Sequence, residues 1–272
     1  MRQLRSLDWF DPREYYSFAR KSTLRAQGLT RAATEGKPVI GICNTASELN
    51  PCNRHLTQVA EAVKRGVWAA GGFPCEFPVI SLGEMFLKPS AMLYRNLMSM
   101  DVEEMIRGNP LDAVVLLGGC DKTIPALLMG AASANIPALV VPGGPMLSGT
   151  FRGQTLGSGT DGRKHFDLYR TGKLNDDDMA ELECSIARSP GHCMVMGTAS
   201  SMALVAEALG MTLPGAAASP HLLESRGRAI VFNSKDEMLA RVNDESFPVE
   251  PDNVLVLRHA GPHGGPGFPE WG

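Results

Sequence analysis

The chain has 272 residues, of which 44% are hydrophobic and 20% are charged, and its formal net charge is −3. This composition is typical of a globular protein with a full hydrophobic core. The small negative charge argues against nucleic acid or an anionic membrane as partner, and no apolar run reaches the roughly 18 residues that a membrane-spanning helix needs. The first nine residues lack the apolar stretch of a secretory signal, so we expect a cytoplasmic protein.

The first part of the chain predicts alternating strands and helices. The predicted strands are short apolar runs bounded by glycine or proline, at residues 37–42, 76–80, 113–117 and 138–141. The predicted helices repeat apolar residues at three- and four-residue spacing, at residues 55–70, 90–107 and 124–133. Continuous apolar strands that alternate with helices are typical of a parallel sheet covered on both faces. We therefore predict an α/β fold with a parallel sheet flanked by helices.

The later part of the chain is less regular. Residues 143–164 are rich in glycine, threonine and serine and predict a long loop, and acidic residues cap a helix that runs from 175 to 187. An apolar helix is predicted at 198–209. Beyond it, strands at 229–232 and 254–257 surround a short helix. We expect two domains, residues 1–219 and 220–272, the second a remnant of a C-terminal β-rich domain.

Polar side chains follow three of the predicted strands. Cys52 follows the first strand, Glu84 follows the second, and the run Cys120, Asp121 and Lys122 follows the third. Because ligands bind outside the carboxyl ends of the strands in open parallel sheets, these residues are expected to meet at one site. Carboxylates such as Glu84 and Asp121 suit Mg²⁺, which prefers oxygen ligands. The alternative is that Asp121 and Lys122 only cap a helix.

A third thiol, Cys193, lies in another loop that leads into a helix. Cys52, Cys120 and Cys193 lack Cys-x-x-Cys spacing, so spacing alone favours ordinary buried thiols. If they met, three thiolates at helix starts would suit an iron–sulfur cluster. The remaining cysteines are interpreted as packing residues, namely Cys43, Cys75 and Cys184.

Two weaker signals lie near these segments. Residues 157–162 fit the pattern G-x-G-x-x-G, but no strand is predicted before them, so we do not expect a dinucleotide site. His165 and His192 are interpreted as structural or surface histidines, with a catalytic role as the alternative.

Three segments taken together resemble one enzyme family, the dihydroxy-acid and sugar-acid dehydratases. They occur in the family's order, at residues 47–53, 118–123 and 191–199, and the resemblance runs through residues 1–219. Residues 68–83 and 95–101 look closest to the aldonic-acid branch, such as arabinonate or xylonate dehydratases. Dihydroxy-acid dehydratases of branched-chain amino-acid biosynthesis are the alternative.

The resemblance implies a hydro-lyase that removes water from a sugar acid to give a 2-keto-3-deoxy acid, and it implies a homo-oligomer. Cys52, Cys120 and Cys193 would hold an iron–sulfur cluster, [2Fe-2S] in preference to [4Fe-4S], with one iron position open to substrate. Glu84 and Asp121 would bind Mg²⁺. Lys122 resembles the lysine that family members carbamylate into a further oxygen ligand.

The end of the chain, residues 264–270, resembles a motif of the family's second domain, in which Glu270 would complete the magnesium site. This motif normally lies much further from the cysteine segments. We therefore expect an internal deletion joined near residues 216–221, together with a missing C-terminal end. The family's catalytic serine base would follow Gly272, so no residue is assigned that role and impaired activity is expected. The alternative from another class is a non-catalytic iron–sulfur or metal-binding remnant.

Overall fold

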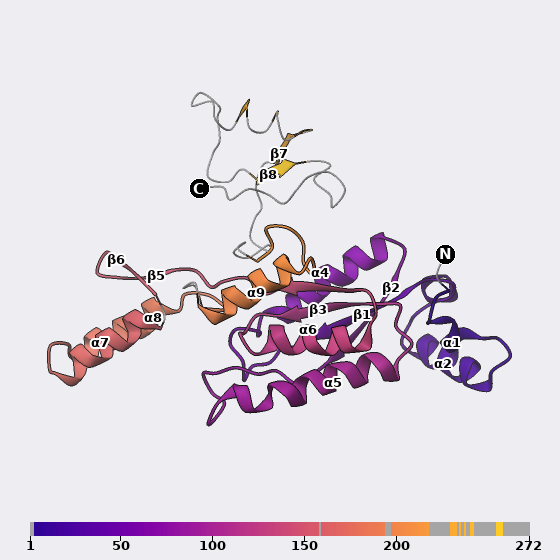
Figure 1. Ribbon diagram of the computed structural model, residues 1–272, viewed down its shortest axis with the longest axis horizontal. Helices are drawn as coiled ribbons and strands as arrows, with labels where there is room; N and C mark the ends of the chain where they lie inside the picture. Colours follow the sequence, from indigo (N-terminus) through magenta and orange to yellow (C-terminus); the bar gives the residue numbers. More distant parts are fainter. Residues whose placement is uncertain are drawn as a thin grey trace. The chain divides into compact units, whose positions relative to one another are not determined.

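The computed structural model in Figure 1 describes residues 3–157, 159–193, 197–217, 229–232 and 254–257, with the single positions 234, 237, 240 and 241. The chain divides into two compact units, residues 1–221 and 222–272. Within the described ranges, no helix is both long enough and apolar enough to cross a bilayer.

A four-stranded parallel sheet forms the centre of the first unit. Its strands are β1 (Val39–Asn44), β2 (Phe73–Pro78), β3 (Ala113–Gly118) and β4 (Ala138–Pro142), in the order β2-β1-β3-β4. The helices between them are α4 (Leu56–Ala69), the short η1 (Ala91–Tyr94) with α5 (Arg95–Gly108), and α6 (Thr123–Ala134). The predicted parallel sheet flanked by helices is therefore confirmed.

Helices cover both faces of this sheet, with α4 on one face and α5 and α6 on the other (Figure 1). Successive strand residues point to opposite faces, so Ile42 packs beneath α4 whereas Cys43 packs toward α5 and α6. In β3, Leu117 likewise packs toward α4, whereas Leu116 packs toward α5 and α6. This two-sided burial explains why the strands read as continuous apolar runs.

Three helices precede the sheet, and the apolar pattern of the sequence predicted none of them. They are α1 (Leu7–Phe10), α2 (Tyr15–Ala26) and α3 (Arg31–Thr34). Apolar side chains of this segment pack against Val39, Phe73 and Leu111 at the amino end of the sheet. Helix α2 is strongly polar and leaves Tyr15 and Tyr16 exposed, so it lacks the regular apolar stripe that marks a helix in sequence.

The prediction of a loop over residues 143–164 was wrong. This region holds the antiparallel hairpin β5 (Gly149–Phe151) and β6 (Gln154–Leu156), followed by α7 (Thr160–Arg170). The hairpin is stabilised by burial of Phe151 and Leu156 against Leu182 of α8 (Asp176–Ile186), a distant contact that local pattern does not reveal. A strand thus precedes the G-x-G-x-x-G pattern, but it is a short hairpin strand and not part of a βαβ unit.

The last elements are α9 (Thr198–Ala208), which packs against α6, and the strands β7 (Ala229–Phe232) and β8 (Val254–Leu257). Helix α8 begins with the expected acidic cap, in which Asn175 and Asp178 bond to each other's backbone amides. In the second unit, β7 and β8 pair in parallel. Their assignment to a remnant of a β-rich domain, and the domain boundary at residue 219, stay predictions.

Packing between α5 and α6 depends on Gly130, which gives a first testable prediction. A Cβ at this position would lie 2.6 Å from the Ser99 carbonyl oxygen and 2.7 Å from the Val102 Cβ. We expect Gly130→Ala to lower the free energy of unfolding by about 1–3 kcal/mol, because overpacking outweighs the better helix propensity of alanine. Chemical denaturation measures this change.

The matched control is Gly66→Ala in α4, where a Cβ meets no atom within 4 Å. Here only helix propensity changes, so this variant is expected to gain about 0.5–1 kcal/mol. Equal effects of the two substitutions would contradict the packing argument.

Candidate metal centre at the carboxyl end of the sheet

The loops after β1, β2 and β3 meet at one buried side chain, Asn53. Its Oδ1 accepts a hydrogen bond from the Gly119 amide at 2.9 Å, and its Nδ2 donates to Thr45 Oγ1 at 2.8 Å and to Ser81 Oγ at 3.3 Å. Because Asn53 is fully buried, these bonds are shielded from competing water. The sequence pattern did not indicate a role for Asn53, although it lies beside Cys52 in the segment 47–53.

The structure brings two of the three predicted thiols together. A Cβ at Gly119 would lie only 2.8 Å from the Cys52 carbonyl oxygen, so the loops approach this closely because position 119 is glycine. The interaction with Cys120 lowers the pKa of Cys52. The same interaction, together with burial and the Asp121 charge, raises the pKa of Cys120. The thiols of Cys52 and Cys120 therefore lie close enough to shift each other's pKa.

Beside the thiols lies a cluster of one lysine and two carboxylates. Lys122 Nζ lies 2.6 Å from Asp121 Oδ2 and 3.3 Å from Glu84 Oε1. Burial opposes the charge on Lys122, but the two carboxylates outweigh it and raise its pKa. Burial likewise opposes the charge on Asp121, whereas hydrogen bonds from Lys122 and from Thr198 Oγ1 at 2.8 Å lower its pKa. An ammonium group thus lies between two carboxylates, an environment that also suits a divalent cation.

The loop that carries Cys193 is joined to the same edge of the sheet on both sides. Before it, the His192 amide donates to the Gly144 carbonyl at 3.0 Å, and Gly143 in turn donates to the Gly118 carbonyl at 2.9 Å. After it, Thr198 at the start of α9 bonds to Asp121. The loop therefore returns to the strand end that bears Cys120.

The complete predicted ligand set is not gathered in the described part of the chain. Among the described residues, no three His, Cys, Asp or Glu side chains are grouped closely enough to hold one metal ion. The donors occur as a thiol pair, Cys52 with Cys120, and a carboxylate pair, Asp121 with Glu84. Their soft and hard chemistry fits an iron–sulfur cluster and Mg²⁺ respectively. Participation of Cys193 stays a prediction, and Glu270 lies outside the described residues.

The other cysteines are not part of this centre. Cys43 is buried and Cys75 partly buried, as expected of packing residues, and burial raises the pKa of Cys75 to about 11. The interpretation of Cys184 as a packing residue was wrong, because its side chain is exposed. Leu182 lies on the buried face of α8. Cys184 lies two residues further along the helix, so its side chain points away from that face.

The two histidines singled out from the sequence are both buried. His165 Nδ1 lies 2.7 Å from the Asp161 carbonyl oxygen, and its ring packs edge-on against Phe151 at 5.3 Å between centroids. These contacts agree with a structural role for His165. His192 is fully buried next to Cys193, and burial lowers its pKa.

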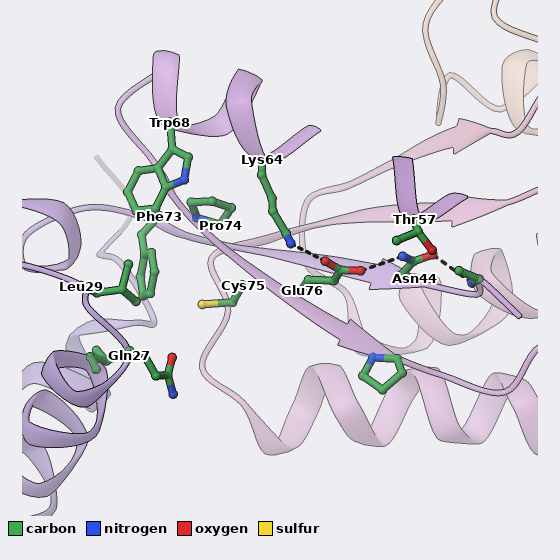
Figure 2. A pocket seen from close by; sticks show the side chains of 13 residues that line it. Gln27, Leu29, Asn44, Thr57, Lys64, Trp68, Phe73, Pro74, Cys75 and Glu76 are labelled. Atoms are coloured by element: carbon green, nitrogen blue, oxygen red, sulfur yellow. Dashed lines mark hydrogen bonds and ion pairs between the residues drawn. The ribbon is translucent and has the colours of Figure 1, made fainter. Parts of the chain in front are cut away.

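A separate pocket of about 670 Å³ lies along the edge strand β2, between α4 and the chain around Leu29 (Figure 2). Trp68 and Phe73 line its apolar part. Its polar groups bond to one another, since Glu76 accepts from Asn44 Nδ2 at 2.7 Å and pairs with Lys64 Nζ at 2.5 Å. None of the predicted metal ligands lines this pocket.

Comparison with known proteins identifies the family. Residues 37–255 match the family described as dihydroxy-acid/6-phosphogluconate dehydratase, N-terminal. The chain belongs to this family. It is 55% identical over 218 residues to L-arabonate dehydratase of Azospirillum brasilense, covering 80% of this chain and 37% of that protein. It is 50% identical over 236 residues to 6-deoxy-6-sulfo-D-gluconate dehydratase of Pseudomonas putida, covering 84% and 41%.

A dihydroxy-acid dehydratase of Moorella thermoacetica is 38% identical over 245 residues, covering 88% of this chain and 44% of that protein. The resemblance to sugar-acid dehydratases that the three segments indicated is thus confirmed. The chain spans about two fifths of the length of these curated relatives.

The buried bonds of Asn53 give the second prediction. Asn53→Ala removes the acceptor of the buried Gly119 amide and one of the two hydrogen bonds of Thr45 Oγ1, which keeps its bond to the Leu117 carbonyl. We expect the free energy of unfolding to fall by about 2–4 kcal/mol, as measured by chemical denaturation. The exposed Asn96, on α5, provides the control, because Asn96→Ala is expected to change stability by less than about 0.5 kcal/mol. A similar small effect at Asn53 would refute its structural importance.

The Glu76 interactions of the edge pocket predict a pH dependence. Burial favours the neutral acid, but hydrogen bonds from Lys64 and Asn44 outweigh it and lower the pKa of Glu76. Its contribution to stability is therefore present above the unfolded pKa of about 4.3 and is lost as pH falls through the lower folded pKa. We expect Glu76→Gln to reduce the loss of unfolding free energy between pH 7 and pH 3, as measured by urea denaturation. Glu48→Gln, at an exposed site, should leave this pH dependence unchanged.

Proposed function

We propose that this chain carries the metal-binding part of a sugar-acid dehydratase, a hydro-lyase that converts an aldonate such as arabinonate or xylonate to a 2-keto-3-deoxy acid. The observation that carries the proposal is the thiol pair Cys52 and Cys120 beside the Asp121, Lys122 and Glu84 cluster. Similarity to two sugar-acid dehydratases at 50% identity or more supports this class of substrate.

In this proposal Cys52, Cys120 and Cys193 hold an iron–sulfur cluster, [2Fe-2S] in preference to [4Fe-4S]. Thiolates are the usual ligands of such clusters, and the lowered pKa of Cys52 favours the thiolate that a cluster requires. The joining of the Cys193 loop to Gly144 and Asp121 supports its inclusion.

Glu84 and Asp121 are proposed to bind Mg²⁺, with Glu270 as a further ligand. Lys122 is proposed to become carbamylated: its neutral amine attacks CO₂, a C–N bond forms, and the displaced proton leaves to solvent. This reaction requires Lys122 to lose the proton that its two carboxylate neighbours now stabilise. A bound divalent cation would neutralise the same carboxylates and so remove the reason for the ammonium charge.

When bound, the cluster iron and Mg²⁺ would supply Lewis acidity for the departing hydroxyl and for the substrate carboxylate. The chain's own residues position these donors. Asn53 fixes the Gly119 amide and with it the loop of Cys120, and Thr198 orients the carboxylate of Asp121. We assign no general base among the described residues. Because such a base contributes about 10²–10⁴-fold, we propose that turnover by this chain alone is impaired.

Two other functions remain as alternatives. A branched-chain dihydroxy-acid dehydratase is favoured by the 38% identity to the Moorella thermoacetica enzyme. A non-catalytic cluster-binding protein is favoured by the lack of an assigned general base among the described residues. Homo-oligomerisation and a cytoplasmic location are also proposals.

The ligand assignment predicts the metal content of the purified protein. After anaerobic reconstitution with iron and sulfide, the wild-type chain should hold one cluster. Substitution of any ligand cysteine by serine (Cys52→Ser, Cys120→Ser or Cys193→Ser) should reduce bound iron and sulfide severalfold. Cys184→Ser at the exposed α8 site is the control and should retain the cluster. A folded wild-type chain without cluster would refute the assignment.

The substrate class is tested separately, by incubating the reconstituted protein with arabinonate, xylonate and dihydroxyisovalerate and measuring 2-keto acid. Weak turnover of an aldonate supports the sugar-acid proposal, and turnover of dihydroxyisovalerate alone supports the branched-chain alternative. A stable cluster with no turnover of any substrate would favour the non-catalytic alternative.

A further inference from the structure

His192 is buried and uses only one of its two ring nitrogens in a hydrogen bond to the described residues. Its side chain is fully buried, and its Nδ1 lies 3.0 Å from the carbonyl oxygen of the next residue, Cys193. Because a carbonyl oxygen only accepts, Nδ1 must carry the proton of this hydrogen bond. The other ring nitrogen, Nε2, has no hydrogen-bond partner among the described residues.

The backbone of His192 is held on both sides as well. Its amide donates to the Gly144 carbonyl at 3.0 Å, and its carbonyl accepts from the Met146 amide at 2.8 Å. Gly191 permits this approach, because a Cβ there would lie 2.7 Å from the Met146 nitrogen, and its φ of +129° disfavours other residues. The peptide that leads into Cys193 is therefore fixed to the segment after β4.

We propose that His192 is a positioning residue for Cys193: its Nδ1–H holds the Cys193 carbonyl while its backbone fixes the loop against Gly144 and Met146. The loop of Cys193 is thereby kept at the carboxyl end of the sheet, where Cys120 follows β3. The importance of this placement for cluster binding rests on the proposed function, but the placement itself does not.

Replacing His192 by asparagine or by glutamine tests the roles of its two ring nitrogens separately. The amide nitrogen of asparagine can take the place of Nδ1, whereas glutamine reaches toward the place of Nε2 and leaves the Cys193 carbonyl without its donor. In the full chain without cluster, we expect His192→Gln to raise the iodoacetamide alkylation rate of Cys193 about fivefold, as loss of one neutral hydrogen bond allows. His192→Asn should stay within about twofold of the wild type. Peptide mass spectrometry reports each cysteine separately, and exposed Cys184 is the internal reference.

His165 supplies the matched control. It is also buried and its Nδ1 also lies near a backbone carbonyl, that of Asp161 at 2.7 Å. His165→Gln should therefore leave the Cys193 rate unchanged. If His192→Gln fails to fold, Gly191→Ala tests the same constraint, because its Cβ would push the loop away from Met146. Far-ultraviolet circular dichroism identifies the folded variants.

Two results would overturn the proposal: an unchanged Cys193 rate in folded His192→Gln and Gly191→Ala, or an equally raised rate in His192→Asn and His192→Gln. Iron content after reconstitution, with its visible absorbance, then tests the proposed function independently. Loss of iron in His192→Gln with rescue in His192→Asn supports both proposals. A raised Cys193 alkylation rate in His192→Gln supports the positioning role. If the iron content is nevertheless unchanged in His192→Gln and in Cys193→Ser, Cys193 is refuted as a ligand.

Discussion

The hydrogen bond between Asn53 Oδ1 and the Gly119 amide is the interaction on which the candidate centre depends. It joins the loop after β1 to the loop after β3, and the close approach at Gly119 puts Cys120 beside Cys52. A parallel sheet brings its carboxyl ends to one edge, but it leaves the loops there free to diverge. Asn53 removes that freedom, because its amide nitrogen also bonds to Thr45 and Ser81.

The sequence predicted those parts of the fold in which burial alone dictates residue type. Strands β1, β3 and β4 are covered on both faces, so their apolar runs are continuous and were recognised within two residues of their bounds. The hairpin β5–β6 escaped prediction because its stability comes from Leu182, a residue far along the chain. The edge strand β2 was predicted to begin three residues too late, because Pro74 interrupts its apolar pattern.

The sequence predicted that Cys52, Cys120, Asp121, Lys122 and Glu84 lie together, but not how they interact, and the inclusion of Cys193 and Glu270 stays a prediction. Positions after strands indicated Cys52, Glu84 and Asp121 without any knowledge of distance. The interaction between the two thiols depends on side-chain geometry that no sequence pattern encodes. Asn53 was overlooked for the same reason: an asparagine in a loop usually caps a turn, and only burial turns it into a link between strand ends.

The carboxylate pair and the thiol pair of the centre influence each other through the charge of Asp121. Asp121 accepts hydrogen bonds from Lys122 and Thr198 and lies 3.4 Å from the Cys120 sulfur, so its negative charge disfavours the Cys120 thiolate. A cation bound by Asp121 would weaken that repulsion and make Cys120 a better ligand. Occupancy of the carboxylate pair would then favour occupancy of the thiol pair. Under the proposed function, linkage makes the reverse hold as well, so the iron–sulfur cluster and Mg²⁺ would favour each other's binding in either order.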